Sequence, residues 1–404
     1  MPPEIVRPAP EERVEAWRED LAALAHELGS RHVAPFRRIS RQDFEAGVAA
    51  LDARIPELSD DGVVIELARI AASIGDGHTG FLLYGPRLGL RQGPLWLLSF
   101  ADGVFVKGVV GDVGADVLNR RLLRVGGVEI EEALARIAPY IRRDNDIDLR
   151  SLAPAYLNLP GVLFAAALTA EPDAAVYTFE GDEGAEIELR CEVLPRGAPV
   201  VYAVRYSEPS QGAPLSERLR TKPYAHERLP GAVYVAFNRC HEDPARPFAE
   251  FCREVFAELD RDPSRHLIID LRSNSGGDSA VVEPLLRGIE RRPELARDHR
   301  VSVLIGRGTF SSGMWAAIDL KLACDATLFG EPTGGTPNAP GNLGTFALPR
   351  STLDVNYSRN LWKKGGERFT GDALEPDVLV QETSRDHFAG IDPVLEAALR
   401  RAGQ

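Results

Sequence analysis

The sequence has few sulfur-containing residues: four cysteines and two methionines in 404 residues. The cysteines are widely spaced and include no CxxC pair, which argues against a disulfide framework and against a cysteine zinc site. We therefore expect reduced cysteines buried in the interior. They are Cys191, Cys240, Cys252 and Cys324.

Long apolar runs are also missing, and none approaches the roughly 20 residues that a membrane-spanning helix needs. Residues 1–8 do not resemble a signal peptide, because no apolar segment precedes the acidic stretch at 11–28. We therefore expect a cytoplasmic protein. The net charge of −13 argues against nucleic acid and against an anionic membrane surface as partners.

What is present is an ordinary globular composition, with 44% hydrophobic and 26% charged residues and enough length for two or three domains. The first 75 residues have helical periodicity. One apolar stripe runs through Val14, Trp17, Leu21, Leu24 and Leu28 and is followed by Gly29. Ser40 is the predicted N-cap of a second helix, and a third helix is expected to begin near Ser59. His78 then lies on a glycine-flanked loop that leaves this helical cap.

From residue 95 the pattern changes to strands. Two strands at 95–100 and 104–110 flank Asp102-Gly103, a strong hairpin signal. The segment 122–130, followed by a helix to about 141, resembles the second half of a PDZ module, without its carboxylate-binding loop. Further strands are expected at 175–179, 186–193 and 200–205. The middle domain is thus predicted to be small, β-rich and partly PDZ-like.

Residues 206–229 are rich in proline, serine, glycine and charge, and predict an exposed loop or linker. After it, strands alternate with helices over short connections, which predicts an α/β core with a largely parallel sheet. The domain division that follows is 1–90 for the helical cap, 91–205 for the middle region, 206–229 for the linker and 230–404 for the core.

Two strand-to-helix junctions in this core carry chemistry. Gly276-Gly277 follows a buried strand at 267–271, and adjacent glycines bring bare N–H groups close to a ligand. Ser311 and Ser312 stand at the next junction, where a helix begins. A simpler interpretation is an ordinary β-to-α turn and a serine N-cap, which accounts for one of the two serines.

Together with three other segments, these junctions resemble the S41 family of serine peptidases, which comprises the tail-specific and C-terminal processing proteases and their tricorn-core relatives. The matching elements are Gly75–Gly80, Asp270–Gly277, Phe310–Gly313, Gly330–Gly335 and Ala373–Val380. The resemblance implies a ClpP/crotonase-like α/β protease core. It covers 230–384 most strongly and 10–85 more weakly.

The resemblance also implies roles for individual residues. The family's nucleophile lies twenty residues before the glutamate of its Gly-Glu-Pro-Thr loop, and Ser311 has this spacing from Glu331. The N–H of Ser312, with that of Gly276 or Gly277, would then bind the oxyanion.

The residue at the position of the general base differs from that of the processing proteases, which have a lysine twenty-five residues after the serine. Here that residue is Thr336. We expect His78 to be the base, as in the tricorn-like relatives, and none of Lys321, Lys363 and Lys364 to take part. With a pKa near its usual value of about 6.5, His78 would give an acid limb at about pH 6–7.

The group that orients His78 stays open. Relatives have a serine before the histidine, whereas this chain has Gly77. Asp76, Asp372 and Glu375 are candidates that the sequence does not rank.

The expected activity is hydrolysis of a peptide or unfolded protein, with no metal or organic cofactor. Two alternatives remain: acyl transfer or cyclisation at the same site, or a catalytically silent member that binds extended peptides. A homo-oligomer is left open.

Overall fold

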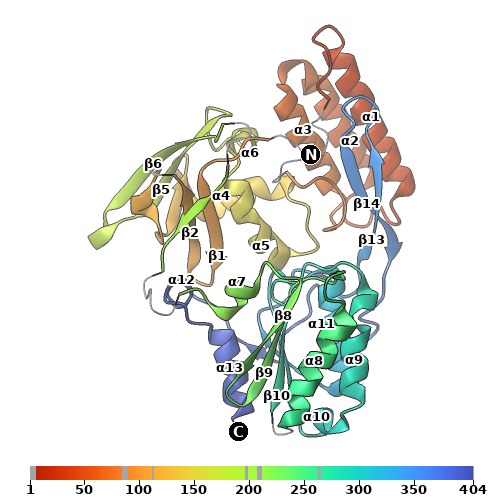
Figure 1. Cartoon of the computed structure of the whole chain (residues 1–404). Coiled ribbons are helices and arrows are strands. Elements are labelled where there is room, and N and C mark those ends of the chain that lie inside the picture. The colour runs from red at the N-terminus through yellow and green to blue at the C-terminus, as the bar shows by residue number, and fades with distance from the viewer. Residues whose placement is uncertain are drawn as a thin grey trace.

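The computed structural model of the chain describes residues 6–83, 90–111, 113–195, 199–206, 212–262 and 265–403. Figure 1 shows three parts: an N-terminal group of helices, a middle region with two small sheets, and a C-terminal core built on a six-stranded sheet. The predicted fold class, an α/β core with a helical and a β-rich addition, is confirmed.

The N-terminal part consists of three helices. They are α1 (Arg13–Arg31), α2 (Arg41–Arg54) and α3 (Asp60–Ala72). Four of the five residues of the predicted stripe on α1 are fully buried, and only Val14 stays partly exposed. Ser40 and Ser59 cap α2 and α3 by accepting hydrogen bonds from the N–H groups of Asp43 and Gly62. Gly29 does not end α1, which continues for two residues.

The middle region contains two antiparallel sheets. The first has the order β1 (Leu95–Phe100), β2 (Gly103–Val110) and β7 (Tyr202–Val204). The second has the order β4 (Val128–Glu129), β3 (Leu122–Val125), β5 (Ala174–Glu180) and β6 (Glu186–Glu192). Three helices accompany them: α4 (Ile130–Ile137), α5 (Asp146–Leu157) and α6 (Pro160–Ala165). The N-terminal end of α5 contributes to the site described below.

The core sheet is parallel except at one edge. Its order is β15 (Val378–Leu379), β12 (Thr327–Gly330), β11 (Val301–Ile305), β10 (His266–Asp270), β9 (Ala232–Phe237) and β8 (Tyr224–Leu229). Only β8 is antiparallel to its neighbour. The helices α8 (Phe248–Arg261), α9 (Glu283–Glu290) and α11 (Ser311–Cys324) belong to the hydrophobic cluster on one face, and α13 (Pro393–Ala402) packs on the other.

Every residue of β10 and β11 is buried, and the two strands are parallel neighbours. The loops that follow them therefore emerge side by side at the carboxyl end of the sheet. This places Gly276-Gly277 and Ser311 at the same edge. The four cysteines are buried, as predicted.

Two features differ from the sequence-based expectation. The interval 206–229 is not simply a linker: it contains α7 (Leu215–Leu219) and β8, and Tyr224 and Ala225 of β8 are buried. The strand was missed because an edge strand exposes much of its length, so its polar residues resemble those of a loop. A hairpin of β13 (Pro340–Ala347) and β14 (Asp354–Leu361) was not predicted at all.

This hairpin lies beside the N-terminal helices, far from the core sheet from which it extends (Figure 1). The fully buried carboxylate of Asp20 in α1 accepts hydrogen bonds from the N–H groups of Arg350 (2.8 Å) and Ser351 (2.9 Å) in the hairpin turn. Gly80 and Asn356 also exchange backbone hydrogen bonds of 2.9 and 3.3 Å. The hairpin thereby attaches the N-terminal helices, and the loop at 75–80, to the core.

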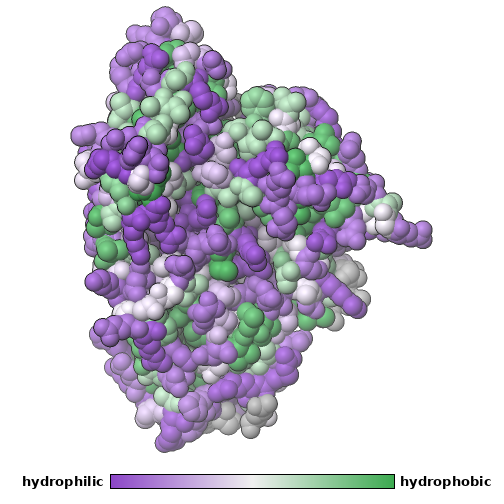
Figure 2. Space-filling view, turned by 180° about the vertical axis from the view of Figure 1, so that it is seen from behind, coloured by the Kyte–Doolittle hydropathy of each residue, from purple (hydrophilic) through white to green (hydrophobic). Residues whose placement is uncertain are grey.

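Among the described residues, no helix combines the length and apolar character needed to cross a bilayer. The face seen in Figure 2 is mainly hydrophilic, with apolar residues in small groups between the polar ones.

The attachment through Asp20 can be tested by replacement with alanine. Asp20→Ala leaves two backbone N–H groups without their acceptor in a buried place, so we expect a loss of about 1–3 kcal/mol in the free energy of unfolding. Glu15→Ala, an exposed position on the same helix, should change it by less than about 0.5 kcal/mol. Urea denaturation measures both, and equal stability of the two variants would contradict the structural role of Asp20.

Candidate active site

Ser311 stands on a sharp turn between β11 and α11. Its φ of +50° is in the left-handed region, which costs a non-glycine residue about 1–3 kcal/mol and projects the side chain away from the helix. Gly276 lies directly against it, because a Cβ on this glycine would be 2.7 Å from Ser311 Cβ and 3.1 Å from Ser311 Oγ. The two predicted junctions therefore meet at this serine.

Side-chain hydrogen bonds hold the two loops together. Ser312 Oγ donates to the carbonyl oxygen of Gly277 (2.8 Å), so this hydroxyl has a structural partner. The fully buried Asn274 accepts from the N–H of Phe310 through its backbone (3.0 Å) and from the N–H of Gly276 through its side chain (3.0 Å).

These bonds decide which N–H groups are available. The N–H of Gly276 is used by Asn274. Within the described parts of the chain, the N–H groups of Gly277 and Ser312 donate no hydrogen bond. A Cβ on Gly276 would lie 3.0 Å from Ser312 N, so this nitrogen lies close to the Gly276-Gly277 turn. The N–H groups of Gly277 and Ser312 are therefore free donors near the serine, the kind of group from which an anion-binding hole is built.

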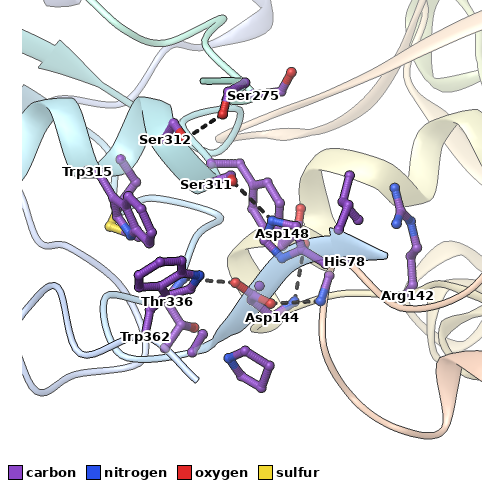
Figure 3. Close-up of a pocket in the computed structure, with 18 of the residues that line it drawn as sticks. His78, Arg142, Asp144, Asp148, Ser275, Ser311, Ser312, Trp315, Thr336 and Trp362 are labelled. Carbon is purple, nitrogen blue, oxygen red and sulfur yellow. Dashed lines mark hydrogen bonds between the residues drawn. The ribbon is translucent and has the colours of Figure 1, made fainter. Parts of the chain in front are cut away.

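His78 reaches this serine from the N-terminal part of the chain. Its Nε2 lies 3.0 Å from Ser311 Oγ, although 233 residues separate the two (Figure 3). The imidazole packs against the ring of Phe310, with centroids 4.8 Å apart. The structure thus brings together the two residues that the sequence singled out as base and nucleophile.

Asp76 holds the His78 loop through its backbone. Its buried carboxylate accepts from the N–H of His78 (2.8 Å), from Thr79 Oγ1 (2.8 Å) and from Ser358 Oγ on β14 (3.0 Å). It also contacts His32 Nε2 at 2.6 Å. Burial raises the pKa of Asp76, but the hydrogen bond and charge of His32 outweigh this and hold the pKa below its usual value.

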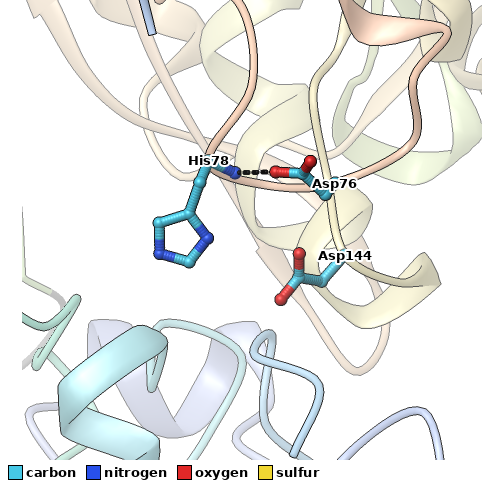
Figure 4. A group of neighbouring side chains, drawn as sticks. All are labelled: Asp76, His78 and Asp144. Carbon is cyan, nitrogen blue, oxygen red and sulfur yellow. Dashed lines mark hydrogen bonds between the residues drawn. The ribbon is translucent and has the colours of Figure 1, made fainter. Parts of the chain in front are cut away.

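Asp144, which the sequence analysis did not identify, lies beside the His78 ring. Its carboxylate accepts hydrogen bonds from the N–H groups of Gly77 (2.7 Å) and Thr336 (3.2 Å). One oxygen each from Asp76 and Asp144 and one ring nitrogen of His78 all lie within 4.8 Å of one another (Figure 4). Nδ1 of His78 is buried and has no hydrogen-bond partner among the described residues. Asp76 and Asp144 are thus the two carboxylates nearest to a ring whose Nδ1 has no partner, and both oxygens of Asp76 already receive hydrogen bonds.

The three residues could each offer one atom to a metal ion, with His78 contributing Nδ1. Both oxygens of Asp76 already receive hydrogen bonds, however, and a metal would have to displace these donors.

Burial dominates the electrostatics of the site. It lowers the pKa of His78 to about 4; the charge of Asp76 opposes this shift and that of Arg142 adds to it. Burial also raises the pKa of Asp144 to about 6, against the opposing effect of the Gly77 hydrogen bond. The acid limb expected for His78 at pH 6–7 assumed a solvated imidazole, whereas a pKa of about 4 moves the protonation of His78 to lower pH.

The other candidates lie elsewhere. The side chain of Asp372 is 85% exposed and that of Glu375 is exposed too, so neither orients His78. Lys321 pairs with Asp377 at 2.9 Å, and none of the three lysines considered lines the cavity at Ser311. Asp144 had only a weak signal in the sequence, a polar run ahead of α5.

A cavity of about 840 Å³ opens at Ser311 and His78. One wall is apolar and includes Met314, Trp315 and Trp362, with the two indoles edge to face at 5.0 Å. Arg142 and Asp148 line another part. Burial first, and then the charge of Asp144, raises the pKa of Asp148 to about 8.

The raised pKa of Asp148 predicts that the stability of the folded protein depends on pH. Its folded-state pKa exceeds the unfolded value of about 4, so wild-type protein loses stability as pH rises from about 4 to about 8. Asp148→Asn removes this loss. We expect the variant to gain stability over wild type progressively across that interval in urea denaturation. Asp146→Asn, an exposed position on the same helix, is the control. A stability difference that is independent of pH would contradict a protonated Asp148.

Comparison with known sequences and solved structures identifies proteins with a similar fold. No protein-family model matches the chain, and no curated protein matches it significantly in sequence. Among solved structures, mature CPAF in complex with lactacystin superposes with a TM-score of 0.63 at 13% identity, over 96% of this chain and 98% of that one. Mature CPAF alone gives 0.62 at 12% identity, over 96% of both chains.

The photosystem II D1 C-terminal processing protease is a more distant match, with a TM-score of 0.43 at 12% identity, over 96% of this chain and 98% of that one. At identities this low, the two superpositions show a shared fold and not a shared activity. The chain therefore has the fold of mature CPAF over 96% of its length, the fold that the S41 resemblance implied.

Proposed function

We propose that this protein is a serine peptidase that hydrolyses peptide bonds through an acyl-enzyme on Ser311, with His78 as general base. The observation that carries the proposal is the distance of 3.0 Å between His78 Nε2 and Ser311 Oγ. This is the contact by which a base removes the hydroxyl proton during attack. It also disfavours the catalytically silent alternative, since binding alone does not require it.

The reaction follows from the positions of these groups. Ser311 Oγ attacks the substrate carbonyl carbon while its proton passes to His78 Nε2. The N–H groups of Gly277 and Ser312 donate hydrogen bonds to the carbonyl oxygen and stabilise the negative charge that develops on it. The imidazolium then protonates the leaving amine, and a water molecule repeats the sequence to release the acyl group. Of the two glycines, Gly277 is the donor, because the N–H of Gly276 is occupied by Asn274.

Asp144 completes the arrangement as a positioning residue. For Nε2 to accept a proton, the neutral imidazole must carry its hydrogen on Nδ1. That nitrogen has no partner among the described residues, and one oxygen of Asp144 lies within 4.8 Å of a ring nitrogen of His78. A negative charge there favours this tautomer and stabilises the imidazolium that forms during attack.

In this proposal each part of the chain has a task. The helical cap up to residue 90 supplies the base, and the core from 230 supplies the nucleophile and the oxyanion donors. The substrate is a peptide or unfolded protein segment, whose apolar side chains suit the wall formed by Trp315 and Trp362. Transfer of the acyl group to an amine would use the same groups.

Labelling with a fluorophosphonate probe tests the nucleophile. We expect one adduct, on Ser311, when the labelled protein is mapped by mass spectrometry. Ser311→Ala should lose it. His78→Ala should label more slowly by about two to four orders of magnitude, because the base is gone.

The lysines serve as controls for the base. Lys321→Ala, Lys363→Ala and Lys364→Ala should label at the wild-type rate. An adduct on Ser312, or unchanged labelling of His78→Ala, would contradict the assignment.

The pH dependence of kcat/KM separates the two buried groups. Activity should fall as pH drops through about 6, where Asp144 gains a proton, and disappear below about 4, where His78 does. In Asp144→Asn the upper step should vanish and leave a lower plateau with a single step near pH 4. A wild-type profile with one step near 6.5, unchanged in Asp144→Asn, would show instead that the imidazole is solvated.

A further inference from the structure

Asp148 presents one carboxyl oxygen to the cavity. The residue stands in the first turn of α5 and is only 6% exposed, yet it lines the cavity at Ser311. Its Oδ2 accepts a hydrogen bond from the N–H of Asp144 (3.2 Å). Its Oδ1 has no hydrogen-bond partner and no ion pair among the described residues. Oδ1 is therefore the oxygen of this carboxyl group that a bound molecule can reach.

The core approaches this oxygen without offering it a partner. Gly334, in the loop after β12, packs against Asp148, and a Cβ on this glycine would be 3.3 Å from Asp148 Oδ1. The same Cβ would lie only 2.4 Å from the carbonyl oxygen of Arg307, so the backbone contact requires a glycine. A glycine supplies no side-chain donor or acceptor, and Oδ1 remains available to the cavity.

The surroundings of Asp148 favour its neutral form. Burial is the main cause, and the charge of Asp144 adds to it, so that the pKa of Asp148 rises to about 8. The hydrogen bond from the Asp144 N–H and the charges of Arg142 and Arg143 oppose this rise without cancelling it. Two buried carboxyl groups so close together do not both ionise readily, and Asp144 is the one that two backbone N–H groups stabilise as an anion.

The other charged groups of the cavity leave this state unchanged. They are His78, Arg307 and Asp278. His78 is neutral at pH 7 because its pKa is about 4. Arg307 is paired with Glu331 at 2.7 Å, and Asp278 is exposed, with its carboxylate bound to the N–H of Ala280.

A neutral carboxyl group carries its hydrogen on one oxygen and donates it. Oδ2 of Asp148 already accepts an N–H, so the hydrogen belongs on Oδ1, the oxygen that faces the cavity. We propose that Asp148 is a substrate-binding residue whose Oδ1–H donates a hydrogen bond to a backbone carbonyl oxygen of the bound peptide. The proposal rests on the peptidase function above and adds to it a contact that is lost as pH rises.

The position of Asp148 suits this contact. Figure 3 shows the residue beside His78, on the opposite side of Ser311 from Trp315 and Trp362. A peptide that crosses Ser311 with an apolar side chain at the indoles brings its following backbone toward Asp148. A donor there fixes the backbone on one side of the scissile bond, whereas the indoles hold a side chain on the other.

The pH dependence of KM tests the proposal. A pool of acetylated, amidated random decapeptides without lysine, tyrosine, histidine and cysteine contains no substrate group that titrates from about pH 6.5 to about pH 9.5. One peptide that wild-type protein cleaves is taken from the pool, and its kcat and KM are measured over that interval. KM should rise about 10-fold as Asp148 ionises near pH 8, the loss expected for one hydrogen bond. We expect kcat not to fall, because His78 and Asp144 titrate at lower pH.

Variants of Asp148 separate this role from a structural one. Asp148→Asn carries an amide N–H donor at every pH, so its KM should stay near the neutral-pH value of wild type and show no step near pH 8. Asp148→Ala should raise KM about 10-fold already at pH 7, again without a step. Asp146→Asn, an exposed position on the same helix, should keep the wild-type profile. Complete fluorophosphonate labelling of Ser311 shows that each variant is folded at the site.

Three results overturn the proposal: a wild-type KM that stays constant to about pH 9.5, an alkaline step that persists in Asp148→Asn, or a wild-type KM at pH 7 in a labelled Asp148→Ala. A step in kcat alone would also overturn it, because the ionisation would then act on the catalytic groups and not on substrate binding. Wild-type protein that cleaves no peptide of the pool refutes the peptidase function itself, and this inference with it.

Discussion

The buried carboxylate of Asp76 is the interaction on which the candidate site depends. It joins three segments that are distant in sequence: His32 after α1, the His78 loop after α3, and Ser358 on β14. A base carried on a short loop can meet a serine 233 residues away only if that loop is fixed to the part of the chain that carries the serine. The hairpin of β13 and β14 makes this connection, and the hydrogen bonds of Asp20 hold its far end.

The second constraint is the exclusion of water around the site. The same burial lowers the pKa of His78 and raises those of Asp144 and Asp148, since it disfavours the charged form of each group. A neutral imidazole at physiological pH is then the default state. Asp144 keeps a charge near neutrality because two backbone N–H groups bind it, whereas Asp148 faces that charge and stays protonated.

The sequence predicted the elements whose signals are local. Apolar periodicity and serine caps located the N-terminal helices, and alternation of strands and helices located the parallel core. It placed Ser311, His78 and the paired glycines through a family resemblance, and the structure brings these residues together. It missed Asp144 because the partners of that carboxylate, Gly77 and Thr336, lie 67 and 192 residues away. The hairpin of β13 and β14 escaped for the same reason, since it packs on helices from the other end of the chain.

The central claim is that His78, Ser311 and the N–H groups of Gly277 and Ser312 act as one catalytic unit. A crystal structure of the fluorophosphonate adduct tests it most directly, because the tetrahedral phosphorus mimics the reacting carbon. We expect phosphorus bonded to Ser311 Oγ, one phosphonyl oxygen about 3 Å from both N–H groups, and His78 Nε2 still facing the adduct. An adduct whose phosphonyl oxygen points away from Gly277 and Ser312, or one formed on another residue, would contradict the account.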